Sequence, residues 1–266
     1  MSKFKDTSTM NFLDRMDMDN IEIDWCAPAI FPDLTDCKYI AVDLETCDPN
    51  LMTLGPGWAR GDGFIAGVAV AAGDFQGYFP IKHEPGGNMA VGAVMKWLQK
   101  QMATPDIPKV FHNSTYDLGW LKWAGIKVEG KIIDTMIAAP LLNENRWSYA
   151  LNSLGRDYLG ETKNEKILRL EAKGWGLDAK ADMWRLPPKF VGEYAEQDAV
   201  LTLKLWKHFE TELSKNELTH IFDLESSLIP LMLEMRSRGV RVDLDQAERT
   251  KKELGRRERE IKEEIK

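Results

Sequence analysis

Two carboxylates, Asp43 and Glu45, stand two residues apart in the segment KYIAVDLET, which covers residues 38–46. The apolar residues before them predict a strand, and residues i and i+2 of a strand project from the same face. Two anions held side by side repel each other, and without a cation between them one is driven toward protonation. The two acids are therefore either metal ligands or the end of a strand that runs out into a polar loop, and the spacing alone favours the loop.

A third carboxylate, Asp198, interrupts the apolar face of a predicted long helix. At helical spacing it shares that face mainly with residues that are readily buried, among them Val191, Tyr194, Ala195, Leu201 and Leu205. A buried carboxylate is costly unless a cation pairs with it, and the cation is either a metal ion or an arginine or lysine elsewhere in the chain. Tyr194 lies one helical turn before Asp198, so both side chains are expected on the same side of the helix.

Two further aspartates follow predicted strands. Asp117 falls in the first turn of a predicted helix, and Ser114-x-x-Asp117 has the form of a capping box. Asp117 also shares a face with Trp120 and follows a strand end, where α/β proteins place their sites, so a cap and a functional role are both open. Asp134 lies between KII and TMIAAPLL and is expected to be a structural helix N-cap.

Four carboxylates thus come from three elements: Asp43, Glu45, Asp117 and Asp198. If they converge, they need divalent cations, and ligation by oxygen alone selects Mg²⁺ or Mn²⁺ over Zn²⁺. Two such ions about 3.5 to 4 Å apart can activate a water and stabilise a leaving oxygen during in-line attack on phosphorus.

Alternating strands and helices are expected to position these residues. Strands are predicted at 39–44, 64–73, 75–81, 109–112 and 131–135, and helices at 89–102, 114–125 and 136–143. A tight turn at Gly73 and Asp74 joins the second and third strands. Pro187 and Pro188 open a long helix from about Lys189 to Leu213, because proline is tolerated in a first turn. The order indicates a layered α/β domain.

The composition narrows the class of protein. A chain of 266 residues that is 44% hydrophobic can bury one large core, or one core and an appendage. Its net charge of −7 argues against a protein that coats nucleic acid, although not against one that grips a strand end. Three cysteines without a C-x-x-C spacing indicate neither a disulfide framework nor a zinc site. A reducing cytoplasm fits this cysteine usage best. No apolar run approaches the ~20 residues of a membrane span, so we expect no membrane partner.

Three segments together resemble the exonuclease motifs of the DEDD superfamily: VDLET (42–46), HNSTYDLGWL (112–121) and YAEQDAV (194–200). The closing Tyr-x-x-x-Asp is that of the tyrosine subclass. Within it, the chain is similar to the 3′-5′ proofreading exonuclease domain of family A DNA polymerases, the bacterial DNA polymerase I and phage replicase group. YFPIKHE (78–84) also resembles that group, and LIPLMLEMRSRGVRVD (228–243) resembles the stretch that joins exonuclease to polymerase.

The resemblance covers roughly residues 33–266 and implies a ribonuclease H-like mixed β-sheet flanked by α-helices, with a C-terminal helical extension. It divides the chain into a lead-in tail (1–35), an exonuclease domain (36–215) and the helical start of a polymerase domain (216–266). The polymerase's own catalytic carboxylates are not in this chain, so we expect a fragment of a longer polymerase.

The resemblance also implies roles for single residues. Asp43 would bridge two metal ions, Mg²⁺ or Mn²⁺, and Glu45 and Asp198 would complete the first site. Asp117 would hold the second ion through water, and Tyr194 would orient the attacking water.

Around the terminal nucleotide, Thr46 and Asn113 would contact or shape the site. Leu51 or Met52 would wedge between the last bases, although the spacing in CDPNLM departs from the family pattern. The expected activity is removal of nucleoside 5′-monophosphates from a single-stranded DNA 3′ end, in the cytoplasm of a bacterial or phage-infected cell. The polymerase domain of the same longer chain would be the partner.

Two alternatives remain. One is a free-standing 3′ exoribonuclease similar to ribonuclease D, against which the polymerase-like carboxyl end argues. The other is an inert nuclease fold that only binds nucleic acid or a partner, against which the presence of all four acids and Tyr194 argues. His112, at a strand end, is expected to be structural.

Overall fold

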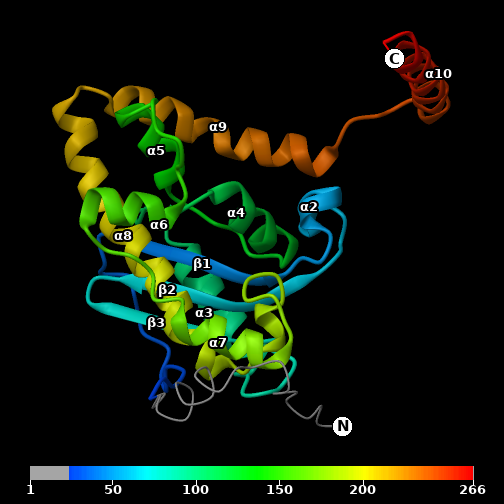
Figure 1. Cartoon of the computed structure of the whole chain (residues 1–266). Helices are drawn as coiled ribbons and strands as arrows, with labels where there is room; N and C mark the ends of the chain where they lie inside the picture. The colour runs from blue at the N-terminus through cyan, green and yellow to red at the C-terminus, as the bar shows by residue number, and fades with distance from the viewer. Residues whose placement is uncertain (1–23, 266) are drawn as a thin grey trace. The chain divides into compact units, whose positions relative to one another are not determined.

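A five-stranded mixed sheet forms the centre of the fold in the computed structural model, which describes residues 24–265 (Figure 1). Its strands are β1 (Ile40–Cys47), β2 (Phe64–Ala72), β3 (Phe75–Pro80), β4 (Lys109–Phe111) and β5 (Ile132–Asp134). Their order across the sheet is β3-β2-β1-β4-β5. The pairs β1–β2 and β2–β3 are antiparallel, whereas the pairs β1–β4 and β4–β5 are parallel. The predicted turn at Gly73 and Asp74 joins β2 to β3, and Gly73 takes the positive φ of 59° that a two-residue hairpin requires.

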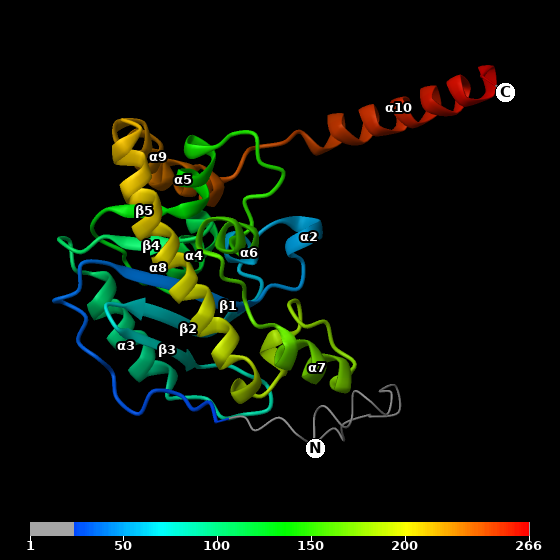
Figure 2. The same ribbon diagram turned by 60° about the vertical axis from the view of Figure 1, so that its left-hand side comes forward.

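Helices cover both faces of the sheet. They are α2 (Leu51–Leu54), α3 (Val91–Met102), α4 (Ser114–Trp123), α5 (Thr135–Leu142), α6 (Leu151–Leu154), α7 (Lys166–Trp175) and α8 (Gly192–Lys215). Short turns of 3-10 helix lie at Gly57–Ala59, Met183–Arg185 and Pro188–Phe190, and Gly155–Leu159 is a turn of π-helix. Figure 2 shows α8 crossing one face of β1, β2 and β3, with α3 behind the opposite face. The predicted α/β architecture of a mixed sheet flanked by helices is confirmed.

The long helix begins later than the sequence predicts. Pro188 opens a 3-10 turn that ends at Phe190, and α8 itself runs from Gly192 to Lys215. Proline at the start of the turn suits its fixed φ and missing N–H, but the chain passes through the tighter turn before the α-helical bonds begin.

Alternate residues of β1 face different cores. Ile40, Val42 and Leu44 belong to a buried cluster with α3 and α4, whereas Ala41 belongs to a second cluster with α8. The period of two that a strand imposes therefore places Asp43 and Glu45, which continue the series of Ala41, on the α8 side.

The segment before β1 packs on the domain. Residues 1–23 of the predicted tail lie outside the described residues. Leu34 is buried in the cluster beneath α3, and the Trp97 indole donates a 2.7 Å hydrogen bond to the Pro32 carbonyl. Trp25 lies against Tyr78 and above Gly192, where a Cβ would meet its ring at 1.9 Å.

The chain divides into two compact units, Met1–Leu233 and Glu234–Lys266, and the division falls within α9 (Thr219–Arg238). The predicted limits at 35/36 and 215/216 stay predictions. Between residues 24 and 265, no helix combines the length and the apolar character that crossing a membrane requires.

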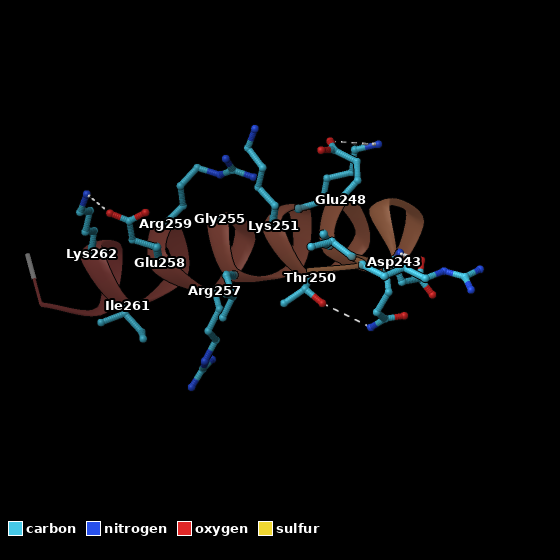
Figure 3. Close-up of a pocket in the computed structure, with 16 residues that line it drawn as sticks. Asp243, Glu248, Thr250, Lys251, Gly255, Arg257, Glu258, Arg259, Ile261 and Lys262 are labelled. Carbon is cyan, nitrogen blue, oxygen red and sulfur yellow. Dashed lines mark hydrogen bonds and ion pairs between the residues drawn. The ribbon is translucent and has the colours of Figure 1, made fainter. Parts of the chain in front are cut away.

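In the second unit, α10 (Leu244–Glu264) has no buried residue and carries i,i+4 ion pairs such as Glu258 with Lys262. The 16 residues that line a hollow along this helix all come from 241–262. Figure 3 shows their labelled side chains pointing outward on different sides of the helix. No set of polar groups converges there, as expected for a solvated charged helix.

Candidate active site

The acid pair of β1 projects beneath α8. Asp43 lies opposite Ala69 and Glu45 opposite Gly67 of β2, and the register then shifts, so that Thr46 lies opposite Ile65 and Ala66 of β2 has no partner in β1. Both carboxylates are half-buried. The interpretation of Asp43 and Glu45 as the end of a strand in a polar loop is wrong, because both residues lie within the paired strand.

Helix α8 brings a third carboxylate to this pair. Asp198 is buried on the face of α8 that packs on the sheet, as the helical spacing predicts. One carboxylate oxygen from each of Asp43, Glu45 and Asp198 lies within 4.8 Å of the others, which forms a possible metal-binding group among residues 24–265. These ligands are all oxygens, and such a set fits a hard divalent cation.

The pKa values of all three acids are raised, as expected where nearby positive charge does not balance the negative charge of the cluster. Burial and the Asp198 carboxylate raise the pKa of Asp43 to about 7. Burial and the charges of Asp43 and Asp198 raise the pKa of Glu45 well above its usual range. Burial also raises the pKa of Asp198, against the opposite effect of Lys163. A divalent cation would favour the ionised form of all three groups.

Asp117 reaches the same strand from α4. It is buried, and its Oδ1 accepts a 3.0 Å hydrogen bond from the backbone N–H of Leu44, the residue between the two acids of β1. Burial, and next the charge of Asp43, raise the pKa of Asp117 well above its usual value. The structure therefore brings Asp117 beside Asp43.

The capping-box alternative for Asp117 is wrong. The N-cap of α4 is Asn113, which makes no side-chain cap bond, and the buried Ser114 hydroxyl has no hydrogen-bond partner. The backbone N–H groups of Asn113 and Ser114 donate instead to Asp134 Oδ1 at 3.0 Å and Oδ2 at 2.7 Å.

Asp134 is confirmed as a helix N-cap, since it also accepts a 2.8 Å hydrogen bond from the Met136 N–H at the start of α5. Its second task, at the start of α4, was not predicted. Asp134 thereby holds Asn113 in a left-handed conformation (φ 69°) and fixes the turn from which Asp117 projects. Asparagine tolerates this conformation better than most residues.

Lys163 is the residue of this site that the sequence analysis missed. Its Nζ lies 2.7 Å from the carboxylate oxygens of Asp198 and donates to the Tyr194 hydroxyl at 3.3 Å. Tyr194 is buried one turn before Asp198, as predicted. The buried stripe of α8 indicated that Asp198 needs a cation, but Lys163 lies in a loop without periodicity, so no pattern singled it out.

Tyr78 lies behind the acid pair. A Cβ at Gly67 would meet the Tyr78 phenol at 2.1 Å, so glycine allows this ring to cross β2 opposite Glu45. Its hydroxyl lies 2.7 Å from His83 Nε2, and His83 Nδ1 lies 2.8 Å from the Leu186 carbonyl. Burial lowers the pKa of His83 to about 4, so the ring is neutral, donates from Nδ1 and accepts at Nε2.

Two of the residues predicted to contact substrate belong to elements that carry the acids, since Thr46 follows Glu45 in β1 and Asn113 is the N-cap of α4. The Thr46 hydroxyl lies 2.7 Å from that of Tyr116, which donates to Asp48 Oδ2 at 3.2 Å. Asn113 is exposed. His112 is structural, as predicted: its Nδ1 lies 2.8 Å from Thr135 Oγ1, and burial lowers its pKa to about 4.

Leu51 and Met52 begin the short helix α2, four and five residues after the end of β1. The Met52 side chain is 94% exposed, and α2 has no buried residue. An exposed thioether is available to a ligand, whereas nothing in the packing of the domain requires it.

The fold and the acid cluster together define the class of protein, a nuclease of the ribonuclease H-like fold. Solved structures share the fold. The polymerase domain of Pol1 from M. smegmatis has a TM-score of 0.59 at 17% identity, covering 85% of this chain and 33% of that one. Escherichia coli RNase D, an exoribonuclease, has a TM-score of 0.54 at 18% identity, covering 78% of this chain and 47% of that one.

Within this class the chain belongs to the 3′-5′ exonuclease domains of family A DNA polymerases, whose family model matches residues 24–214. It is 38% identical over 242 residues to a DNA-directed DNA polymerase of Pseudomonas phage M6, covering 89% of this chain and 36% of the relative. The chain therefore spans about a third of the length of that relative. The predicted 3′-5′ exonuclease is confirmed, and divalent metal use goes with its family.

Proposed function

We propose that this chain removes nucleoside 5′-monophosphates from DNA 3′ ends, with two divalent ions, Mg²⁺ or Mn²⁺. The observation that carries the proposal is the convergence of Asp43, Glu45 and Asp198 within 4.8 Å in a member of an exonuclease family. Divalent ions at such a site supply an activated water and stabilise the leaving oxygen.

Each residue has a part that its position supports. Asp43, Glu45 and Asp198 would hold the first ion, and Asp43 would also contribute to the second. Asp117, one of whose oxygens accepts the Leu44 N–H, would hold the second ion through water. Tyr194 orients the attacking water, because its hydroxyl lies one turn from Asp198 at the same cluster.

The substrate is a single-stranded DNA 3′ end. Thr46 and the exposed Asn113 shape the site around the last nucleotide, and Leu51 or Met52 wedges between the last bases. DNA is favoured over RNA because the relatives matched in sequence are named as DNA polymerases, whereas the likeness to RNase D concerns the fold.

The chain acts as the proofreading part of a longer DNA polymerase in the cytoplasm of a bacterial or phage-infected cell. Phage and bacterial relatives carry the matching segment as about a fifth to a third of a DNA polymerase, which supports this context. The polymerase domain of the same longer chain is then its partner.

The test is degradation of 5′-labelled single-stranded DNA and RNA of one sequence, with Mg²⁺, Mn²⁺ or a chelator. We expect a ladder that shortens from the 3′ end on DNA, that needs either ion and that the chelator abolishes. Faster degradation of RNA than of DNA would contradict the proposed substrate, and degradation in chelator would contradict the metal site.

A further inference from the structure

Lys163 places an ammonium group at the acid cluster. It belongs to the loop between the π-helical turn and α7, and its side chain is 10% exposed. Its Nζ lies 2.7 Å from the Asp198 carboxylate and 3.3 Å from the Tyr194 hydroxyl. The ammonium thus engages two of the residues to which the proposed function gives a part in the reaction.

The loop holds this ammonium in place through its backbone. The Lys163 N–H donates to Asn152 Oδ1 of α6 at 3.0 Å, and the Asn164 N–H donates to Gln197 Oε1 of α8 at 2.8 Å. Gln197 directly precedes Asp198, so the loop is anchored to the same turn of α8 that carries the carboxylate. A lysine placed in this way is a built part of the site and not a surface side chain that swings over it.

One ammonium does not neutralise the cluster. Its charge of +1 faces the carboxylates of Asp43, Glu45 and Asp198, and the more distant Lys180 also acts on the last two. A divalent ion held by the same three residues would need the Asp198 oxygens that Lys163 contacts. Two cations on one carboxylate repel each other strongly in a partly buried site.

We propose that Lys163 is the counter-cation of the metal-free site, which a divalent ion must displace from Asp198. The lysine is then a positioning residue that holds Asp198 and Tyr194 in place before the ion arrives and that limits the affinity for the ion. This inference rests on the proposed function, which makes Asp43, Glu45 and Asp198 the ligands.

A permanent ion pair between Lys163 and Asp198 would behave differently. If Asp198 never leaves the lysine, removing the ammonium leaves the buried Asp198 carboxylate unpaired, and the free energy of unfolding falls equally with and without metal. If the ion displaces the lysine, the loss of stability is confined to the metal-free protein, and added ion reduces it because the ion binds the folded state of the variant more tightly.

The experiment measures Mn²⁺ binding to the full chain without DNA, by calorimetry and by the electron spin resonance of free Mn²⁺. The variants are Lys163→Met, which removes the ammonium, and Lys163→Gln, which retains a hydrogen-bond donor. Lys204→Met is the matched control, because Lys204 pairs with Glu161 at the start of the same loop but is solvent-exposed and lies outside the acid cluster.

We expect both Lys163 variants to bind the ion at least about tenfold more tightly than the parent, since removing a unit charge at this distance is worth more than 1.4 kcal/mol. Lys204→Met should bind like the parent. Melting temperatures measured over an ion titration should show a deficit of Lys163→Met in chelator that disappears at saturating Mn²⁺.

Equal or weaker binding by the two Lys163 variants, or a deficit in melting temperature that Mn²⁺ does not change, would overturn the inference. So would the absence of saturable binding in the parent and the variants. Cleavage of labelled DNA by the parent is scored separately: a parent that exchanges lysine for metal but leaves DNA intact refutes the proposed function and not the exchange.

Discussion

The Asp117 carboxylate accepts a 3.0 Å hydrogen bond from the backbone N–H of Leu44, and this bond ties the first turn of α4 to the strand that carries Asp43 and Glu45. Leu44 itself points into the opposite core, so only its backbone serves the site. A backbone hydrogen bond thus sets the position of Asp117 relative to the acid pair, and substituting the neighbouring side chains does not remove its donor.

Replacing both acids of β1 should separate activity from stability. Asp43→Ala combined with Glu45→Ala removes two proposed ligands, so exonuclease activity should fall to background. In chelator the domain should be as stable as the parent or more so, because the half-buried carboxylates repel each other and Asp198. Urea unfolding and cleavage of labelled DNA measure the two effects.

Asp36→Ala with Asp74→Ala is the control for this pair, since it removes two negative charges at exposed positions. A double variant at residues 43 and 45 that still degrades DNA at a comparable rate would show that these acids are not ligands.

Tyr194→Phe should slow the chemical step and leave binding intact. The ring keeps its packing, and only the hydroxyl beside Asp198 and Lys163 is lost. Removing one group that orients a reactant typically costs about 10²- to 10³-fold in rate, so kcat should fall while affinity for the strand changes little. Single-turnover cleavage of the terminal nucleotide measures this.

Tyr39→Phe is the matched control, because the Tyr39 hydroxyl also bonds to α8, at Glu210, outside the acid cluster. A Tyr194→Phe rate within about threefold of the parent at saturating Mg²⁺ would mean that Tyr194 is structural.

Asp134→Ala should destabilise the domain without removing a ligand. The carboxylate accepts three backbone N–H groups at the starts of α4 and α5, and it is buried. We expect a loss of about 1 to 3 kcal/mol in the free energy of unfolding. Asp134→Asn should lose less, because one oxygen still accepts, and both should cleave DNA at temperatures where they are folded.

Urea midpoints measure the loss, with Asp106→Ala at an exposed position as control. A folded Asp134→Asn protein without metal-dependent activity would show that Asp134 acts in the site and is more than a helix cap.

His83 should make the domain sensitive to acid. Its pKa is lowered to about 4 in the fold, against an ordinary 6.5, so between these values the unfolded chain binds a proton that the folded chain does not. The stability that the domain gains from keeping His83 neutral is therefore fully present above pH 6.5. It declines as the pH falls toward 4, by about 1.4 kcal/mol of unfolding free energy per pH unit. His112 has the same sign.

The measurement is the free energy of unfolding of the parent, of His83→Gln and of the exposed control His220→Gln between pH 7.5 and 4.5. The stability gap between the parent and His83→Gln should narrow by that amount per unit as the pH falls. A constant gap would show that His83 is protonated in the folded domain.

The predictable parts of the site lie on regular elements. Asp43 and Glu45 share a face because of the period of two in β1, and Asp198 follows Tyr194 because of the helical period in α8, so sequence spacing was sufficient. The caps were harder to predict. A local pattern, Ser114-x-x-Asp117, matched a capping box, but the N–H groups at the start of α4 are taken by Asp134, which is far enough along the chain that only the packing of β5 beside β4 brings it there.

Lys163 could not be predicted for a related reason. Its loop has neither period, and its position depends on hydrogen bonds to Asn152 and Gln197, which come from two separate helices. The local sequence indicates that Asp198 needs a cation. Which of the 35 lysines and arginines lies beside it depends on the tertiary structure.

The register shift between β1 and β2 after Glu45 determines where β1 can change length. Before this shift, inserting or deleting one residue would turn Asp43 and Glu45 toward the core beneath α3 and bring apolar side chains under α8. A register change of one residue would therefore disrupt both the core and the acid cluster. After this shift the extra residue is Ala66 of β2, because Thr46 pairs with Ile65 and not with Ala66, so the pairing beyond Glu45 no longer sets the face of the two acids. Insertions and deletions should therefore accumulate between Thr46 and α2 and be absent from Ile40 to Glu45 in chains that keep the nuclease.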